Sequence, residues 1–194
     1  MAVFLLTTLS WLLLQNHSLG DKQIDARIET SYAASDPQFE RVRGAVLDAS
    51  IAGENHVQAL RNGDEIFPAM LIAIRSAQHT ITLETCIYWS GTIGREFAEA
   101  LAARTRAGVS VSVHMMLDWW GTELDESNLD AMRAAGIEVQ RYNPPRLAML
   151  GRMNNRTHRK LLVVGGRIGL IEGVGIADSS RGHAQGPQHW RDMH

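Results

Sequence analysis

Residues 154 to 175 read NNRTHRKLLVVGGRIGLIEGVG, and this stretch decides how the later part of the chain folds. Two short apolar runs lie on either side of Gly165-Gly166, which is the pattern of two strands joined by a two-residue turn. The pattern predicts a hairpin with strands over 160–164 and 167–171. An irregular basic stretch, residues 146–156, leads into the hairpin.

His158 and Lys160 stand at the start of this hairpin. Side chains alternate between the two faces of a strand, so these two would project from the same side, about 6.6 Å apart along the chain. A histidine is largely neutral at pH 7, and its ring nitrogen can attack phosphorus to give a covalent phospho-enzyme. A lysine ammonium can hold the oxygens of the same phosphate. A histidine near a strand start can also be purely structural, so the pair alone leaves both interpretations open.

The part of the chain before the hairpin alternates between strand and helix patterns. Asn62-Gly63 is predicted to be a turn, with Asp64 as the N-cap of the helix that follows. The β-α-β-α-β-α-β order favours an α/β fold with a largely parallel (mixed) sheet flanked by helices. The remaining predicted elements are strands over 56–61, 79–88, 109–117 and 137–142 and helices over 93–107 and 125–135.

The first 20 residues differ in character from the rest, because residues 2–14, AVFLLTTLSWLLL, are almost wholly apolar. This run is shorter than the roughly 20 residues that a membrane span needs, and it lacks the basic start and Ala-x-Ala site of a signal peptide. We expect residues 1–20 to be an apolar anchor or signal-like segment, residues 21–38 a polar linker and residues 39–194 the folded domain. Such a start indicates a cell envelope.

Composition narrows the chemistry of the chain. A net charge of −2 and a pI near 6.4 provide no overall basic field for nucleic acid. The single cysteine, Cys86, excludes an internal disulfide, argues against a cysteine metal site and is predicted to be a buried thiol. His183, His189 and His194 lack the spacing of metal ligands, so we predict no metal site.

Glu84 stands alone as a charged residue among Leu83, Cys86 and Ile87 in an apolar strand pattern. An unpaired carboxylate buried there would be costly. Glu84 is therefore either a carboxylate that lines a pocket or a structural residue paired with an arginine of the basic stretch, residues 146–156.

At His158 and Lys160 the chain resembles the phospholipase D superfamily, whose HKD signature is His-x-Lys-x-x-x-x-Asp followed by a glycine-rich segment. The resemblance is narrower than the superfamily, because several segments are similar to the first half of bacterial cardiolipin synthase-type enzymes. It covers about residues 37–194 and is highly specific. These segments are NNRTHRKLLVV (154–164), GVGIAD (173–178), HWRDMH (189–194), TLETCIYWSG (82–91) and NGDEIFPAM (62–70).

The resemblance implies a phospholipase D-like phosphatidyltransferase, which moves a phosphatidyl group between a phospholipid and an alcohol through a phosphohistidine. It implies His158 as the nucleophile, Lys160 as a phosphate ligand and no metal or organic cofactor. Asp192 matches the carboxylate that bonds and orients the histidine, a role that fixes the ring tautomer and supports positive charge on the ring. A solvated residue is the alternative interpretation of Asp192.

The resemblance also suggests what the site binds. Candidate substrate-binding residues are Glu84, Asn155, Arg156 and Gly173. The implied partners are a phosphatidylglycerol-like phospholipid, an alcohol acceptor and a membrane surface, in a bacterial cell envelope, and nucleic acid is not expected.

The sequence departs from the family pattern in three places. No second His-x-Lys occurs before the chain stops at His194, so we expect half of the family's bilobal, two-motif site to be absent. Gly165 stands where the signature has Asp, although a glycine suits the turn. Glu172 stands where Gly is usual, and its charge would weaken the binding of an anion. Gly175 is typical of the cardiolipin synthase-like branch.

Three readings of the chain follow from these departures. A homodimer or a complementary C-terminal half would supply the second motif to an active phosphatidyltransferase. A non-catalytic lipid-binding half-domain would need no second motif. A dimeric single-motif nuclease is the third reading, which the acidic overall charge disfavours.

Overall fold

The structure is a computed structural model of the chain, and it describes residues 4, 6–11, 32–47, 53–107, 112–144, 156–171 and 173–194. The chain divides into two units, and each is described by itself. One unit comprises Met1–Asn16 with Ala59–His194, and the other comprises His17–Gln58.

The smaller unit contains one helix, α2 (Pro37–Leu47), in its described residues, and none of the residues of α2 is buried. The Asp36 carboxylate accepts a hydrogen bond from the amide of Gln38 at 2.8 Å, and this bond caps the helix start. The predicted linker, residues 21–38, overlaps α2 by its last two residues. Residues 21–31 lie outside the described residues, and a domain start at residue 39 stays a prediction.

The apolar start of the chain is helical over residues 6–11, and this short helix is exposed. Within the described residues, no helix combines the length and the apolar character needed to cross a membrane. An anchor or signal-like role for residues 1–20 stays a prediction.

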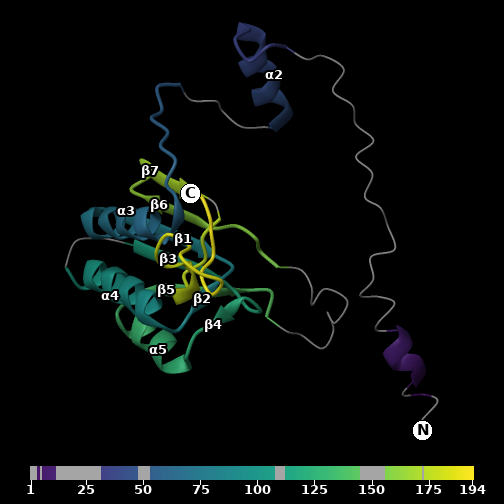
Figure 1. Cartoon of the computed structure of the whole chain (residues 1–194), viewed down its shortest axis with the longest axis vertical. Helices are drawn as coiled ribbons and strands as arrows, with labels where there is room; N and C mark the ends of the chain where they lie inside the picture. Colours follow the sequence, from purple (N-terminus) through teal and green to yellow (C-terminus); the bar gives the residue numbers. More distant parts are fainter. Residues whose placement is uncertain are drawn as a thin grey trace. The chain divides into compact units, whose positions relative to one another are not determined.

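A five-stranded mixed sheet forms the centre of the larger unit (Figure 1). The strands lie in the order β5-β3-β1-β6-β7, and β1, β3 and β5 are parallel to one another. β6 runs antiparallel to β1, and β7 runs antiparallel to β6. The predicted α/β class and largely parallel, mixed sheet are confirmed. The bounds are β1 Thr80–Thr85, β3 Ser112–Asp118, β5 Glu138–Tyr142, β6 Leu161–Val164 and β7 Ile168–Ile171.

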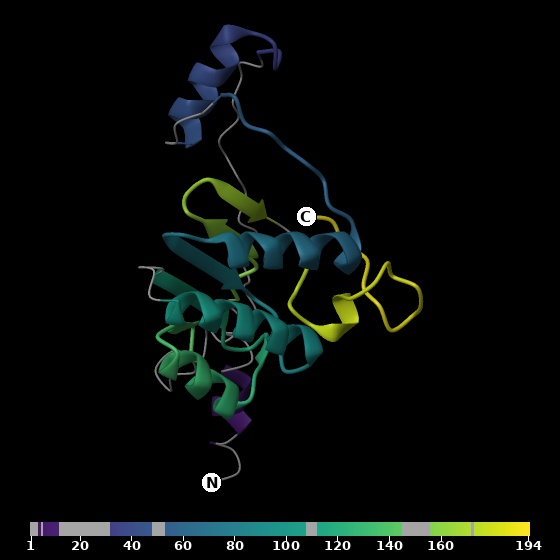
Figure 2. The same ribbon diagram turned by 90° about the vertical axis from the view of Figure 1, so that its left-hand side faces the viewer.

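Three helices, α3 (Asn62–Ser76), α4 (Thr92–Arg106) and α5 (Glu126–Ala134), lie side by side along the sheet (Figure 2). Strand alternation provides the apolar face beneath them, because Ile81 and Leu83 of β1 are fully buried whereas Thr82 between them is exposed. Phe67 of α3 and Phe97 of α4 meet edge to face, with ring centroids 5.9 Å apart. Burial of these apolar side chains is the main stabilising contribution to the core.

Several predicted elements are confirmed to within one residue. α4 and α5 match the helices predicted over 93–107 and 125–135, and Gly136 closes α5 with a positive φ of 90°. β5 matches the strand predicted over 137–142. β3 extends to Asp118, while residues 109–111 lie outside the described residues.

The strand predicted over 56–61 is wrong, because these residues form only an isolated bridge at Arg61. The turn predicted at Asn62-Gly63 and the N-cap predicted at Asp64 are also wrong, because α3 begins at Asn62. The backbone of Leu60 exchanges two hydrogen bonds with that of His194, at 3.0 and 2.9 Å. The amide of Asn62 donates to the carbonyl of Asp192 at 2.9 Å. The segment therefore pairs with a distant stretch of chain instead of joining the sheet.

The strand predicted over 79–88 is two strands. β1 ends at Thr85, and β2 (Tyr88–Trp89) pairs in parallel with β4 (Thr122–Glu123) in a separate two-stranded sheet. In the bend between β1 and β2, the Thr85 hydroxyl donates to the carbonyl of Ile87 at 2.9 Å. Cys86 lies in this bend and is buried, as predicted.

The predicted hairpin is present, with one difference in its turn. Gly165 and Gly166 have φ values of 58° and 66°, a conformation that glycine adopts without strain. Val164 pairs with Ile168, so three residues, not two, separate the strands. β6 also begins at Leu161, one residue later than predicted, and the reactive segment precedes the strand.

Asp178 caps α4 across 86 residues of sequence. Its carboxylate accepts hydrogen bonds from the amides of Thr92 and Ile93 at 2.9 and 2.8 Å, which satisfies two amides that a helix start leaves unpaired. Burial raises the pKa of Asp178, but the hydrogen bonds from Ile93 and Thr92 and the charge of Arg181 outweigh it and hold the pKa below its ordinary value. The cap ties the segment after β7 to α4.

Replacing this cap tests its contribution. Asp178→Ala is expected to lower the free energy of unfolding by about 1 kcal/mol at pH 7. A carboxyl whose pKa is lower in the folded state stabilises the fold above its unfolded-state pKa and loses that contribution as the pH falls through the folded-state value. Urea denaturation from pH 7 down to acid pH should therefore show the difference shrinking. Asp130→Ala, which removes an exposed partner of Arg133, is the control, and a pH-independent difference for Asp178→Ala would contradict this account.

Candidate active site

Two carboxylates stand at the carboxyl ends of neighbouring parallel strands. Glu84 lies one residue before the end of β1, and Asp118 is the last residue of β3. Both are buried, with 8% of Glu84 and 0% of Asp118 exposed. Buried carboxylates are costly unless they accept hydrogen bonds, so their donors determine the local structure.

Thr157 donates to both carboxylates. Its amide donates to Oδ2 of Asp118 at 2.8 Å, and its hydroxyl donates to Oε1 of Glu84 at 2.7 Å. The other oxygen of Glu84 lies 3.5 Å from Nε of Arg159. Glu84, Asp118 and Thr157 are called the Thr157 clamp below. The clamp fixes the backbone one residue before His158.

Asp118 also shapes the turn that follows β3. Its Oδ1 accepts the amides of Trp120 and Gly121 at 2.9 and 3.0 Å. A side chain at Gly121 would overlap the carbonyl of Cys86, so the turn needs glycine there. The sequence analysis missed Asp118. An Asp-x-x-Gly directly after a buried strand is the signal that would have indicated it.

Of the two interpretations of Glu84, the structure shows an ion pair, and the described partner is Arg159, which follows the basic stretch. Arg146 and Arg152 lie outside the described residues. Glu84 also lines a small cavity of about 160 Å³ on the sheet, together with Thr82 and Met116. That cavity is separate from the one lined by His158. A role for Glu84 in substrate binding stays a prediction.

His158 and Lys160 line one cavity. His158 is exposed and Lys160 is half-buried, and both lie in the extended segment that leads into β6. The cavity has a volume of about 400 Å³, enough for a phosphate and part of the group that carries it. Its other lining residues are Arg159, Leu161, Ile171 and Gly173.

Asp192 lies at the border of this cavity. A methyl group on Gly173, a lining residue, would overlap the Asp192 carboxylate, and Gly173 has a φ of 22°. Asp192 Oδ1 accepts the amide of Met193 at 2.9 Å, and its own amide donates to the Asn62 side chain at 3.2 Å. Among the described residues no hydrogen bond joins Asp192 to His158, so the orienting role stays a prediction.

The structure describes only some of the remaining residues that the sequence singles out. Asn155 and Glu172 lie outside the described residues, and Arg156 is exposed. Gly173 lines the His158 cavity and is the one candidate substrate-binding residue that does so in the described part of the chain. No group of three or more His, Cys, Asp or Glu that could hold a metal ion occurs within the described ranges.

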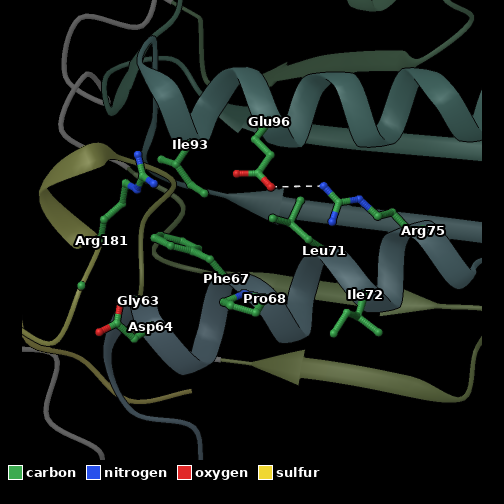
Figure 3. A pocket seen from close by; sticks show the side chains of 11 residues that line it. Gly63, Asp64, Phe67, Pro68, Leu71, Ile72, Arg75, Ile93, Glu96 and Arg181 are labelled. Atoms are coloured by element: carbon green, nitrogen blue, oxygen red, sulfur yellow. Dashed lines mark hydrogen bonds and ion pairs between the residues drawn. The ribbon is translucent and has the colours of Figure 1, made fainter.

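A third cavity, of about 340 Å³, lies between α3 and α4 (Figure 3). Phe67 and Leu71 point into it, and the ion pair of Arg75 with Glu96, at 3.1 Å, closes one side. Its described lining includes no His, Cys, Ser or Lys and shares no residue with the lining of the His158 cavity.

Comparison with known proteins finds several bacterial cardiolipin synthases that are similar to this chain. A cardiolipin synthase of Geobacillus kaustophilus is 33% identical over 147 residues, which are 75% of this chain and 28% of that protein. Cardiolipin synthase B of Shigella flexneri is 35% identical over 142 residues, which are 71% of this chain and 33% of that protein. Cardiolipin synthase B of Escherichia coli K12 is 37% identical over 124 residues, which are 62% of this chain and 29% of that protein.

The chain is similar to these cardiolipin synthases over most of its own length, and it spans a third or less of the length of these relatives. No family model matches the chain. Nuc, a phospholipase D family member from Salmonella typhimurium, superposes with a TM-score of 0.49 at 19% identity, over 66% of this chain and 76% of that chain, a likeness too slight to extend the argument.

The Thr157 clamp is tested by Thr157→Val, which keeps the side-chain shape and removes the hydroxyl. Glu84 then loses a hydrogen-bond donor, so the free energy of unfolding should fall by about 1–3 kcal/mol. In a Glu84→Gln background, Thr157→Val should lower the free energy of unfolding by less, because the side chain that accepts the hydrogen bond is then neutral. A double-mutant cycle by urea denaturation measures the coupling, and additive effects would contradict the clamp.

The packing of Gly173 on Asp192 is tested by Gly173→Ala. The added methyl group would overlap the carboxylate, so we expect a loss of about 1–3 kcal/mol in the free energy of unfolding. Gly169→Ala is the matched control, because a methyl group on Gly169 of β7 meets nothing within 4 Å. Equal unfolding midpoints for the two variants would show that Asp192 does not pack on Gly173.

Proposed function

We propose that the chain is the part of a cardiolipin synthase-type phosphatidyltransferase that carries the nucleophilic histidine. The observation that carries the proposal is the single cavity lined by His158, Lys160 and Gly173. The cardiolipin synthases among the relatives support a phospholipid as substrate and a phosphodiester as the bond that reacts. The chain spans only part of those relatives, so the activity itself is a proposal.

The first step is attack of the His158 imidazole on the lipid phosphorus. A bond forms between the ring nitrogen and phosphorus while the bond from phosphorus to the leaving oxygen breaks. The Lys160 ammonium, two residues along the same extended segment, holds the non-bridging oxygens as their charge rises. An acceptor alcohol then attacks the phosphorus, so that an O–P bond forms and the N–P bond to His158 breaks. The proton of the alcohol passes to a general base, and the free histidine is restored.

Asp192 is proposed to hold the other ring nitrogen of His158. Such a bond fixes the tautomer and stabilises the positive ring that forms on attack. The place of Asp192 against Gly173, at the cavity border, supports this role. Catalytic hydrogen bonds are often long or absent without substrate and tighten in the complex.

The leaving alkoxide needs a proton, and a second histidine is proposed to give it. The 194 residues contain one His-x-Lys, at His158, so this group would come from another part of the protein or from a second copy. Without it, the chain is expected to form the phosphohistidine slowly and to release it more slowly still.

Gly165 is compatible with this chemistry. The turn takes a positive φ at Gly165, and nothing lies within 4 Å of where a side chain would begin. The carboxylate of the signature is therefore dispensable for the hairpin itself. Glu172 lies outside the described residues.

The proposal is tested by trapping the phosphohistidine. The chain is incubated with phosphatidylglycerol labelled in its phosphate and quenched in alkali, because phosphohistidine is acid-labile, and the labelled peptide is identified by mass spectrometry. We expect label on His158, none in His158→Ala, and a rate about 10²-fold lower in Lys160→Ala.

His183→Ala is the matched control. His183 is exposed and pairs with Asp64 at 3.4 Å, outside the His158 cavity, so this variant should label as the wild type does. Label that persists in His158→Ala overturns the assignment. Absence of label in every variant, with vesicles still bound, would favour the non-catalytic lipid-binding reading.

A further inference from the structure

Aromatic residues gather at one end of the sheet. The sequence has five tryptophans, and four of them lie at or beyond the carboxyl ends of the parallel strands, together with a tyrosine. They come from four separate segments of the chain. This set is called the aromatic edge and consists of Trp89, Trp119, Trp120, Tyr142 and Trp190.

Hydrogen bonds and a ring contact connect the aromatic edge. The carbonyl of Tyr142, the last residue of β5, accepts the amide of Trp119 at 3.1 Å. The indole nitrogen of Trp89 donates to the carbonyl of Gly121 at 3.1 Å. The rings of Trp89 and Trp190 meet edge to face with centroids 5.4 Å apart. The edge therefore runs from the outer strand β5 to the segment after β7.

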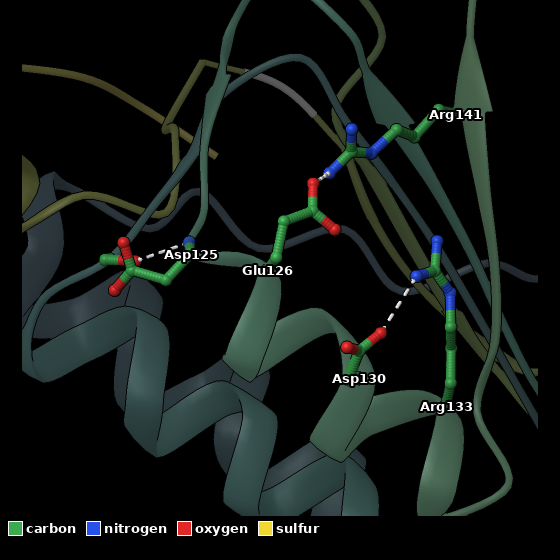
Figure 4. Close-up of polar contacts among 6 residues, drawn as sticks. Asp125, Glu126, Asp130, Arg133 and Arg141 are labelled. Atoms are coloured by element: carbon green, nitrogen blue, oxygen red, sulfur yellow. Dashed lines mark hydrogen bonds and ion pairs between the residues drawn. The ribbon is translucent and has the colours of Figure 1, made fainter.

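Arg141 holds Trp119, a half-buried member of the aromatic edge that lies beneath it. Its guanidinium lies over the Trp119 ring, 4.6 Å from the centroid, and it forms an ion pair of 2.8 Å with Glu126 of α5 (Figure 4). Trp119 is half-buried beneath it. The exposed aromatic surface is thus made by Trp120, Tyr142 and Trp190, which are 36%, 39% and 40% exposed.

The aromatic edge is linked through Asp118 and Asp192 to the segments that line the reactive cavity. Asp118 accepts the amide of Trp120 with one oxygen and that of Thr157, next to His158, with the other. Trp190 lies two residues before Asp192, which packs on Gly173 of the cavity lining. A surface that binds through this edge would present its molecules to His158.

We propose that the aromatic edge is the surface with which the chain lies on a lipid bilayer, at the level of the headgroups. Tryptophan and tyrosine favour this interface because an apolar ring enters the acyl boundary while a polar tip stays in water. Single apolar residues scattered over a surface need no explanation, whereas exposed apolar residues that gather in one region commonly mark an interaction site. The proposal rests on the proposed function, which makes a phospholipid the substrate.

Charge favours a lipid surface over a second copy of the chain as the partner. Arg156 and Arg191 are exposed near His158, and Arg159 and Lys160 belong to the cavity itself. In a two-fold interface the same patch meets itself, so these cations would face cations. An anionic bilayer complements them, and each cation near its surface adds to the binding.

The test measures binding of the full chain to vesicles of phosphatidylglycerol and phosphatidylcholine in equal parts. Trp120→Ser with Tyr142→Ser removes two exposed rings outside the reactive cavity, and we expect about tenfold weaker binding. Ile72→Ser, which removes an exposed apolar side chain of α3, is the matched control and should bind as the wild type does. Trp11→Ser tests the apolar start separately. Vesicles with brominated acyl chains should quench wild-type fluorescence more than that of the double variant.

Unchanged vesicle binding by the double variant overturns the proposal, and so does an equal loss in Ile72→Ser. Binding that depends on Trp11 alone would assign the contact to the apolar start and contradict the aromatic edge. A wild-type dimer that the double variant dissociates, with vesicle binding unchanged, would assign the edge to a second copy.

The two proposals fail in distinguishable ways. A short-chain phosphatidylglycerol that stays monomeric in solution can phosphorylate His158 without a bilayer. If that label forms equally in wild type and double variant while vesicle binding is unaltered, the surface is wrong and the proposed function stands. If no label forms on any substrate while vesicle binding drops tenfold in the double variant, the surface stands and the proposed function is wrong.

Discussion

Thr157 is held between two buried carboxylates, and the geometry beside His158 depends on those two hydrogen bonds. Asp118 takes the Thr157 amide and Glu84 takes its hydroxyl, at 2.8 and 2.7 Å. Burying either carboxylate without these donors would destabilise the fold. The hydrogen bonds therefore hold Thr157 and the two carboxylates in place. Glu84 lies opposite Met116 in the adjacent strands β1 and β3, and Asp118 follows two residues farther along β3. The reactive segment is thereby fixed to the carboxyl ends of these two strands.

Contacts between distant parts of the sequence complete the site. The segment after β7 has little regular structure, and its 3-10 turn, Asp178–Ser180, is held by the cap on α4. Further along, His194 exchanges backbone hydrogen bonds with Leu60. These bonds place Asp192 against Gly173 at the cavity border. Segments without local propensity thus gain their structure from tertiary partners, as functional segments commonly do.

Much of this architecture could be predicted from the sequence, and the reasons for the failures are physical. The helices α4 and α5, the strand β5 and the hairpin have clear periodicity and glycine signals, so their bounds were predicted closely. Residues 56–61 alternate like a strand, but Leu60 and Arg61 pair with His194 and Met193 at the other end of the sequence, and no local pattern shows that. Asp118 ends an apolar run with a single charge, so its partnership with Thr157 emerges only when the sheet brings β1 and β3 together.

Hydrogen exchange at the Thr157 amide tests the central claim, that the Thr157 clamp holds the reactive segment, most directly. In 15N-labelled chain followed by NMR, we expect the Thr157 amide to exchange slowly, at the rate of core amides of β1, while the Arg159 amide exchanges fast. In Asp118→Asn, Thr157 should exchange faster, while amides of α5 keep their rates. Rapid exchange of Thr157 in the wild-type chain, equal to that of Arg159, would contradict the account.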